Sequence, residues 1–273
     1  MDVRPIGIFD SGLGGLSAVK EIAQILPNES IVYFGDTGRV PYGTKSEKTI
    51  IKYASQDEAF LLSKNVKMII AACGTVSSVA KCTGDDLNVP FLGVVEPSAC
   101  DAVKSTKNKK IGVIGTSATV KSGSYEKAIK EIDSEIEVYS VACPLFVSIV
   151  EQGWIKDDDE IALLTAKRYL QPLLEKGVDT LILGCTHFPL ISGTIARVMG
   201  ENVTLISSGG ATAKAAAKLL KENDMLSDGK SCFKKYYVSD SVDGFSSTAK
   251  LFLGENTDMN VEQIGIENYG KKD

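Results

Sequence analysis

The sequence predicts an α/β protein of two similar lobes, each a mostly parallel sheet flanked by helices, with the active site in the cleft between them. Short apolar runs of strand length alternate with longer stretches of helical spacing over the whole chain. The runs are almost continuously apolar, which is typical of parallel strands buried on both faces. A weak internal similarity also divides the chain into two units of similar length.

The strand-like runs recur at intervals that leave room for a helix between most of them. We predict helices such as those at 46–63 and 158–175. We predict strands at residues 6–9, 31–34, 67–71, 91–95, 111–114, 137–141, 180–183 and 203–206, with a weaker one at 235–238. This alternation favours parallel sheets joined by crossover helices.

Two pairs of segments carry the internal similarity. Residues 6–9 (IGIF) resemble 111–114 (IGVI), and residues 69–73 (IIAAC) resemble 181–185 (LILGC). Each unit therefore opens with one strand of this kind and later ends another strand in a cysteine. We predict a first lobe of residues 1–96 plus 208–273, which carries Cys73, and a second lobe of residues 97–207, which carries Cys185.

Composition narrows the class of protein. A chain of 273 residues that is 44% hydrophobic can bury two cores, and a net charge of −5 gives no reason to expect nucleic acid as the main partner. No apolar run is long enough for a membrane span, and the first residues lack the order of a signal peptide, so we expect a cytoplasmic protein. The six cysteines are expected to be reduced, and with no C-x2-C pair and one histidine we predict no metal.

Cys73 and Cys185 stand apart from the other cysteines. Each directly follows an apolar strand, has a threonine within two residues, and lies at a predicted helix N-terminus, where the helix dipole lowers a thiol pKa. Most cysteines are simply small buried hydrophobes. We assign that role to Cys82, Cys100, Cys143 and Cys232.

A pair of opposed thiols fits one kind of chemistry in particular. Inverting a carbon centre requires a proton to leave one face and another to arrive on the opposite face. Two groups that flank the carbon can do this, one as thiolate and one as thiol. Two lobes that face each other across a cleft would place one cysteine on each side.

Polar, glycine-rich turns follow the same strands, and ligands of open α/β sheets bind beyond the carboxyl ends of strands. Asp10 ends the first strand and Asp36 follows the second, although either carboxylate could instead cap the next helix. His187, the only histidine, lies two residues after Cys185, and a proton-transfer role beside that thiol is favoured.

Residues 12–17 approximate a dinucleotide-binding motif, with Asp36 at the end of the next strand. Ser17 replaces the third glycine of that motif, and Asp10 would repel a pyrophosphate. We therefore predict no nicotinamide cofactor.

The sequence resembles the glutamate racemase family over nearly the whole chain. The resemblance is carried by residues 8–15 (IFDSGLGG), 36–43 (DTGRVPYG), 72–75 (ACGT), 150–153 (VEQG) and 183–190 (LGCTHFPL). It implies a racemase that interconverts L-glutamate and D-glutamate without a cofactor. It further implies that Cys73 and Cys185 transfer the protons, helped by Asp10 and His187.

The resemblance also implies a substrate site and a cellular role. Glu151, and Asp36 with it, would support the site from nearby. Substrate contacts are expected from Asp10, Ser11, Tyr42, Gly43, Gly74, Thr75, Thr116, Thr186 and His187. D-glutamate would feed peptidoglycan synthesis for the bacterial cell wall, glutamate would be the small-molecule partner, and a homodimer stays open as the assembly.

One departure keeps alternatives open. The family usually has asparagine after its first cysteine, whereas this chain has Gly74, which offers only backbone and space. A racemase of aspartate or another amino acid is therefore an alternative. Two others are a non-catalytic two-lobe protein that binds a small acid, and a relative that uses one cysteine to decarboxylate or isomerise a diacid.

Overall fold

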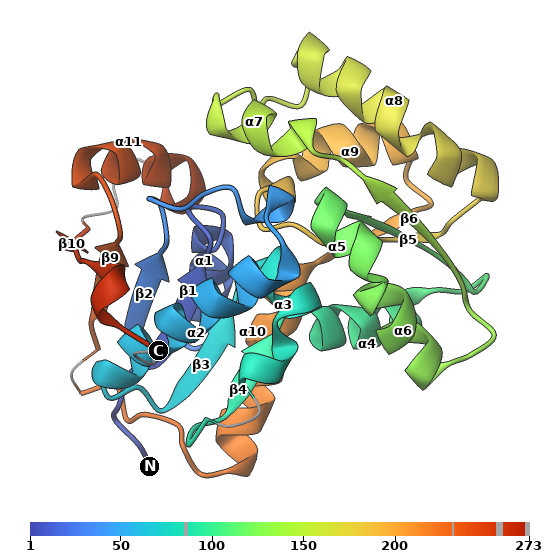
Figure 1. Ribbon diagram of the computed structural model, residues 1–273. Coiled ribbons are helices and arrows are strands. Elements are labelled where there is room, and N and C mark those ends of the chain that lie inside the picture. The colour runs from blue at the N-terminus through green and yellow to red at the C-terminus, as the bar shows by residue number, and fades with distance from the viewer. Residues whose placement is uncertain (85–86, 231, 255–258, 271–273) are drawn as a thin grey trace.

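Two parallel sheets, each between layers of helices, make up the protein (Figure 1). The computed structural model describes residues 1–84, 87–230, 232–254 and 259–270, and the side chains of residues 81 and 82 lie outside that description, so the role predicted for Cys82 is not addressed. One sheet has six strands in the order β10-β9-β2-β1-β3-β4, and the other has four in the order β6-β5-β7-β8. The predicted α/β fold is confirmed.

The six-stranded sheet collects both ends of the chain. Its strands are β1 (Ile6–Asp10), β2 (Ile31–Gly35), β3 (Met68–Ala71), β4 (Phe91–Gly93), β9 (Lys234–Val238) and β10 (Val261–Gln263). Its helices and 3-10 turns are α1 (Leu16–Ile25), η1 (Tyr42–Thr44), α2 (Glu47–Ser63), α3 (Gly74–Val79), η2 (Lys81–Gly84), α11 (Val242–Leu253) and η4 (Ile266–Asn268).

Alternation of side chains along the strands builds a core on each face of this sheet. Ile6 and Ile8 of β1 belong to the core that α1 and α11 cover, whereas Phe9 belongs to the core beneath α2. Since parallel strands are covered on both faces, each can be apolar throughout. All five residues of β1 and of β2 are buried.

The four-stranded sheet is built the same way from the middle of the chain. Helices α4 and α6 cover one face, and α8 and α9 cover the other. The strands are β5 (Lys110–Gly115), β6 (Glu137–Ala142), β7 (Thr180–Leu183) and β8 (Thr204–Ser207). The helices and 3-10 turn are α4 (Val95–Ser105), α5 (Ser117–Ser122), α6 (Ser124–Ile132), α7 (Leu145–Glu151), α8 (Glu160–Lys176), η3 (Phe188–Ile191), α9 (Ser192–Met199) and α10 (Ser208–Glu222).

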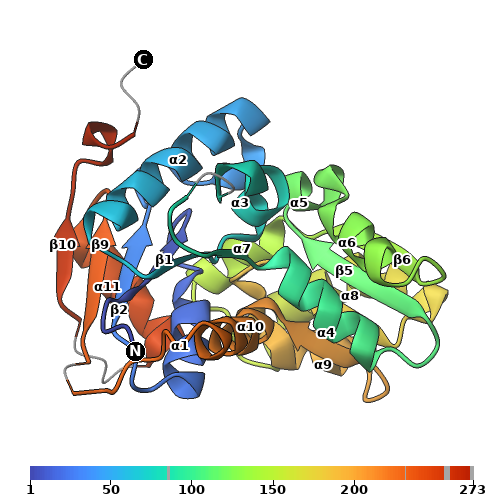
Figure 2. The same ribbon diagram turned by 90° about the horizontal axis from the view of Figure 1, so that it is seen from below.

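Helix α10 packs against both halves of the molecule. It lies between α1 and α4, as Figure 2 shows from below. Gly209 permits the close approach to α1, because a Cβ at this position would lie 3.1 Å from the Cα of Ala18. The lobe limits at 96/97 and 207/208 stay a prediction. The strands themselves follow a clear pattern, since those of residues 110–207 form one sheet and the rest form the other.

Most predicted elements are found within a few residues. Helix α2 is capped by Ser46, whose side chain accepts from the Thr49 N–H, and α8 is capped by Asp159. The strand predicted at 91–95 ends at Gly93, because α4 begins at Val95. Strand β10 was not predicted, since it has only three residues and two of them are exposed.

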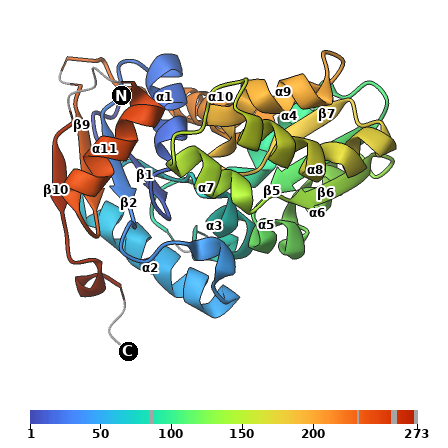
Figure 3. The same ribbon diagram turned by 90° about the horizontal axis from the view of Figure 1, so that it is seen from above.

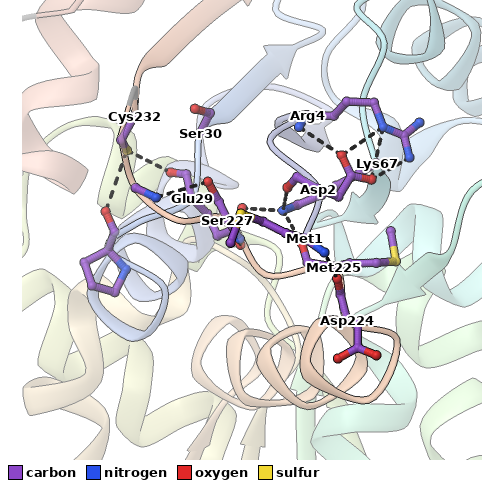
Figure 4. Close-up of polar contacts among 12 residues, drawn as sticks. Met1, Asp2, Arg4, Glu29, Ser30, Lys67, Asp224, Met225, Ser227 and Cys232 are labelled. Carbon is purple, nitrogen blue, oxygen red and sulfur yellow. Dashed lines mark hydrogen bonds and ion pairs between the residues drawn. The ribbon is translucent and has the colours of Figure 1, made fainter.

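A buried ion pair fixes the return of the chain from α10 to the first sheet (Figure 4). The ammonium of Lys67, which is 0% exposed, lies 2.6 Å from Glu29 Oε2. It also donates to the carbonyls of Asp2 at 2.8 Å and Met225 at 2.7 Å. Glu29 Oε1 accepts from the Ser227 N–H. The pair therefore links the N-terminal segment, two strand starts and the segment after α10.

Replacing Lys67 with methionine is expected to lower the free energy of unfolding by about 3–5 kcal/mol, because the buried charge of Glu29 would lose its cation. The additional change Glu29→Gln should restore part of the loss. Urea denaturation measures both effects. The control is Lys218→Met, which breaks an exposed pair at 3.8 Å and should change little. Equal effects of the Lys67 and Lys218 variants would contradict this account.

Candidate active site

A cavity of about 300 Å³ opens where the carboxyl ends of the two sheets face each other. Both lobes contribute to its walls. The predicted residues that line it are Ser11, Tyr42, Gly43, Cys73, Gly74, Thr75, Thr116, Glu151, Cys185, Thr186 and His187. Strands and turns that are far apart in the sequence therefore converge on one space, as expected for parallel sheets.

The two thiols occupy equivalent positions on the two sheets. Cys73 follows β3 and is the N-cap residue of α3, whereas Cys185 follows β7. The strands β3 and β7 each pair with the first strand of their unit, β1 and β5. Cys73 is 5% exposed and Cys185 is 6% exposed, and both line the cavity. The internal similarity of the sequence thus corresponds to two matched thiols at one site.

Cys73 is held as a thiol. Its sulfur donates to Ser11 Oγ at 3.5 Å. Burial, with the nearby charge of Asp10, raises the pKa of Cys73 to about 12. The prediction that the helix dipole lowers this pKa was wrong, because α3 has only six residues and burial outweighs its effect.

The predicted helix N-terminus at Cys185 is also wrong. A turn follows this cysteine, and the 3-10 helix η3 begins only at Phe188. The charged group close to the sulfur is instead the imidazole of His187, whose Nδ1 lies 3.9 Å away. A neighbouring side chain, rather than a helix dipole, therefore provides the electrostatic environment of Cys185.

His187 bridges Cys185 and Glu151. Its Nε2 lies 3.0 Å from Glu151 Oε1. Burial lowers the pKa of His187, but the hydrogen bonds to Cys185 and Glu151 outweigh burial and raise the pKa to about 10. His187 is therefore an imidazolium at neutral pH, and an imidazolium stabilises negative charge on an adjacent sulfur.

Asp10 and Asp36 are buried but do not line the cavity. Asp10 lies behind the wall, where Oδ2 accepts from the Gly12 N–H at 3.0 Å and Oδ1 accepts from the Thr186 hydroxyl at 3.5 Å. Burial raises the pKa of Asp10, although the charge of His187 opposes this. Asp36 is bonded to Arg39, Tyr42 and Ser239. The direct substrate contact predicted for Asp10 stays a prediction.

The two lobes touch at the floor of the cavity. The hydroxyls of Thr75 and Thr116 lie 3.0 Å apart, and Ser17 Oγ donates to the Thr186 carbonyl at 2.9 Å. Helices α3 and α5, one from each lobe, lie side by side (Figure 3). A Cβ at position 74 would stand only 2.3 Å from the Gly184 carbonyl oxygen. Glycine at 74 is thus what lets the two turns approach this closely.

Some residues at the site were not predicted from the sequence. Pro144, Val147 and Ser148 line the cavity around the start of α7. They follow the carboxyl end of β6, so the strand-end rule could have found them. Asp57 contacts the Tyr42 hydroxyl, and Arg39 bonds to Asp36 and Asp57. No sequence signal marks Asp57, which lies within α2.

Within the described ranges, no group of three or more histidine, cysteine or acidic side chains could hold a metal ion. Nor does a described helix combine the length and apolar character required to cross a membrane.

Comparison with known proteins identifies the family. The chain is 44% identical over 269 residues to glutamate racemase of Geobacter metallireducens, covering 98% of each chain. It superposes on glutamate racemase RacE1 of Bacillus anthracis with a TM-score of 0.92 and 37% identity, covering 97% of this chain and 98% of that one.

A second solved structure is that of glutamate racemase from Francisella tularensis in complex with D-glutamate, with a TM-score of 0.91 and 40% identity, covering 98% and 100% of the two chains. The predicted resemblance to glutamate racemases is confirmed. The model of the Asp/Glu/Hydantoin racemase family matches residues 6–216, and the chain belongs to this family.

Proposed function

We propose that the protein is a cofactor-independent glutamate racemase, an isomerase in which Cys73 and Cys185 act on opposite faces of the α-carbon. One observation carries the proposal: two thiols from equivalent strand ends of two sheets line the same cavity of about 300 Å³. Binding alone would require neither thiol, whereas inversion by two groups requires both.

The two thiols have different neighbours, and we assign a different starting role to each. Cys185, whose sulfur lies 3.9 Å from His187 Nδ1, starts as the base, and Cys73, whose pKa is raised, starts as the acid. The Cys185 thiolate removes the α-proton, and the electron pair left on carbon takes the proton of Cys73 on the other face. Cys73 is then the thiolate and Cys185 the thiol, so the opposite enantiomer reacts by the reverse steps.

The substrate would be held by polar groups of both lobes. Thr75 and Thr116, whose hydroxyls meet at 3.0 Å, can share one carboxylate, and Ser11, Gly43 and Thr186 offer further donors. The Francisella tularensis relative binds D-glutamate, which supports a substrate of this class. Asp10, Asp36 and Glu151 act by positioning their neighbours, namely Thr186, Tyr42 and His187.

Gly74 favours a second candidate, a racemase of aspartate or another amino acid. Position 74 lies so close to the Gly184 carbonyl that a Cβ there would stand 2.3 Å from its oxygen. Glycine offers a substrate only its backbone at this position, and a site that lacks a side-chain amide there suits a different amino acid. We retain glutamate as the first choice, because the relatives that match over the full chain are glutamate racemases.

The cellular role follows from the product. D-glutamate would enter peptidoglycan synthesis, and we propose a cytoplasmic enzyme that works as a homodimer. Exposed apolar side chains at the start of α7, in the segment after it and on α8 are candidates for self-association: Leu145, Trp154, Ile161 and Leu164. Light scattering in solution tests the dimer.

Incubation with L-glutamate in D2O, without added cofactor, is expected to exchange the α-proton and abolish optical rotation. Cys73→Ala and Cys185→Ala should each lower the rate by about 10²–10⁴-fold, because each removes an acid/base group. Cys100→Ala, outside the cavity, is the control. Wild-type rates in both variants would refute the two-thiol mechanism. Exchange on aspartate alone would shift the assignment, and no exchange at all would favour a binding protein or a diacid enzyme.

Titration of His187 is expected to affect stability. Its pKa is raised in the folded protein, so its contribution is complete below about pH 6.5 and is lost as pH rises towards about 10. His187→Gln should therefore lose most stability relative to wild type below about pH 6.5 and least above about pH 10. Urea denaturation across this range measures the difference. A difference that does not change with pH would show that His187 is not an imidazolium.

Gly74→Ala is expected to lower kcat/KM for glutamate by between about tenfold and about a hundredfold, because its Cβ would force the two turns apart around the thiols. Steady-state kinetics with glutamate and aspartate provide the measurement. The control is Gly210→Ala, where the nearest atom to the new Cβ is 3.7 Å away. An active Gly74→Ala enzyme with unchanged substrate preference would mean that this contact sets neither rate nor specificity.

A further inference from the structure

A buried polar cluster lies behind the cavity wall, away from the thiols. It consists of Asp36 after β2, Arg39, Tyr42 of η1, Asp57 of α2 and Ser239 after β9. Asp36 and Asp57 are both fully buried. Of these residues only Tyr42 lines the cavity, so the cluster reaches the site through that side chain and its turn.

Tyr42 donates its single hydroxyl proton to Asp36. Oδ1 of Asp36 accepts from Ser239 at 2.7 Å, and Oδ2 accepts from Arg39 Nε at 2.6 Å and from the Tyr42 hydroxyl. The Tyr42 oxygen also lies 3.2 Å from Asp57 Oδ2. Because the shorter contact to Asp36 takes the tyrosine proton, a hydrogen bond to Asp57 needs a proton on Asp57.

The charges of the cluster also require a proton on Asp57. Arg39 is the cation that faces the two carboxyls, with Nη2 3.0 Å from Asp57 Oδ1. Asp36 faces Asp57 from the β2 side, and Glu58 lies next to it on α2. One guanidinium can balance one buried carboxylate but not two. Burial, followed by the charge of Asp36, raises the pKa of Asp57 well above its ordinary value, although Arg39 opposes this.

We propose that Asp57 is a neutral, protonated acid in the folded protein and a positioning residue for the racemase. It donates to Tyr42, which donates to Asp36, and this relay holds the turn of Tyr42 and Gly43 against the cavity. Gly43 in turn meets Thr116 of the other lobe, whose Cβ would lie 3.1 Å from a Cβ at position 43. The positioning role rests on the proposed function, whereas the proton on Asp57 does not.

The two aspartates are therefore expected to differ in their tolerance of an amide. In Asp57→Asn the new NH2 can replace the acid proton and the amide oxygen can still accept from Arg39. In Asp36→Asn the amide would face three donors with only one acceptor atom. We expect Asp57→Asn to keep the urea midpoint of wild type or exceed it, and Asp36→Asn and Asp57→Leu to lower it. Asp158→Asn, at an exposed site, is the control.

The pH dependence adds a second measurement. Wild-type Asp57 must bind a proton on folding at any pH above the ordinary aspartate pKa. Its titration therefore lowers the free energy of unfolding of the protein as pH rises. Asp57→Asn needs no proton, and its midpoint relative to wild type should increase from about pH 6 to about pH 8. Titratable groups that both proteins contain contribute equally to the two midpoints, so their effects cancel when the midpoints are subtracted. Equal losses for Asp57→Asn and Asp36→Asn, with no trend in pH, would overturn the proposal.

Kinetics test the positioning role. Asp57→Asn should keep the KM and kcat of wild type, whereas Asp57→Leu should raise KM for glutamate by about tenfold with a smaller effect on kcat, because a binding wall is displaced. In a Tyr42→Phe background the difference between asparagine and leucine at 57 should shrink. Unchanged KM in Asp57→Leu would refute positioning. If wild type does not racemise glutamate, the proposed function fails, while the urea data still decide whether Asp57 carries a proton.

Discussion

The cavity depends on one constraint, that the carboxyl ends of two parallel sheets meet face to face. The carboxyl ends of all strands in a parallel sheet lie at the same edge. The turns after β1 and β3 therefore lie together, as do the turns after β5 and β7. The contact between the two edges is tight, because the position of Gly74 leaves no room for a Cβ beside the Gly184 carbonyl. Two chemically similar strand ends, one from each sheet, therefore bring Cys73 and Cys185 to the same small space.

The two thiols of the cavity have different charged neighbours. Around Cys73 the nearby charge is the carboxylate of Asp10, which adds to the effect of burial and favours the neutral thiol. Around Cys185 the neighbour is His187, whose positive charge is maintained by Glu151. The proposed pair of one acid and one base is therefore consistent with the side chains beside each thiol. The relay through Asp57 and Tyr42 extends the same principle to the wall of the cavity, where one arginine balances one of two buried carboxyls.

Sequence patterns located the fold and most of the cavity wall for physical reasons. Apolar runs mark buried parallel strands, and the rule that ligands bind at carboxyl ends then selects turns such as those of Cys73 and Cys185. The same patterns could not distinguish a residue that lines the cavity from one directly behind it, as Asp10 and Asp36 show. Nor could they detect Asp57, which shares Arg39 with Asp36 because α2 packs against β1 and β2. Strand β10 escaped because three partly exposed residues carry no periodic signal.

The central claim, that two thiols flank one carbon, is tested most directly by a crystal structure of the protein with bound glutamate. The account predicts that the sulfurs of Cys73 and Cys185 lie on opposite faces of the α-carbon, each at about 3.5 Å, which is the distance of a near-attack geometry. A substrate whose α-carbon has both sulfurs on the same face, or one of them out of reach, would contradict it.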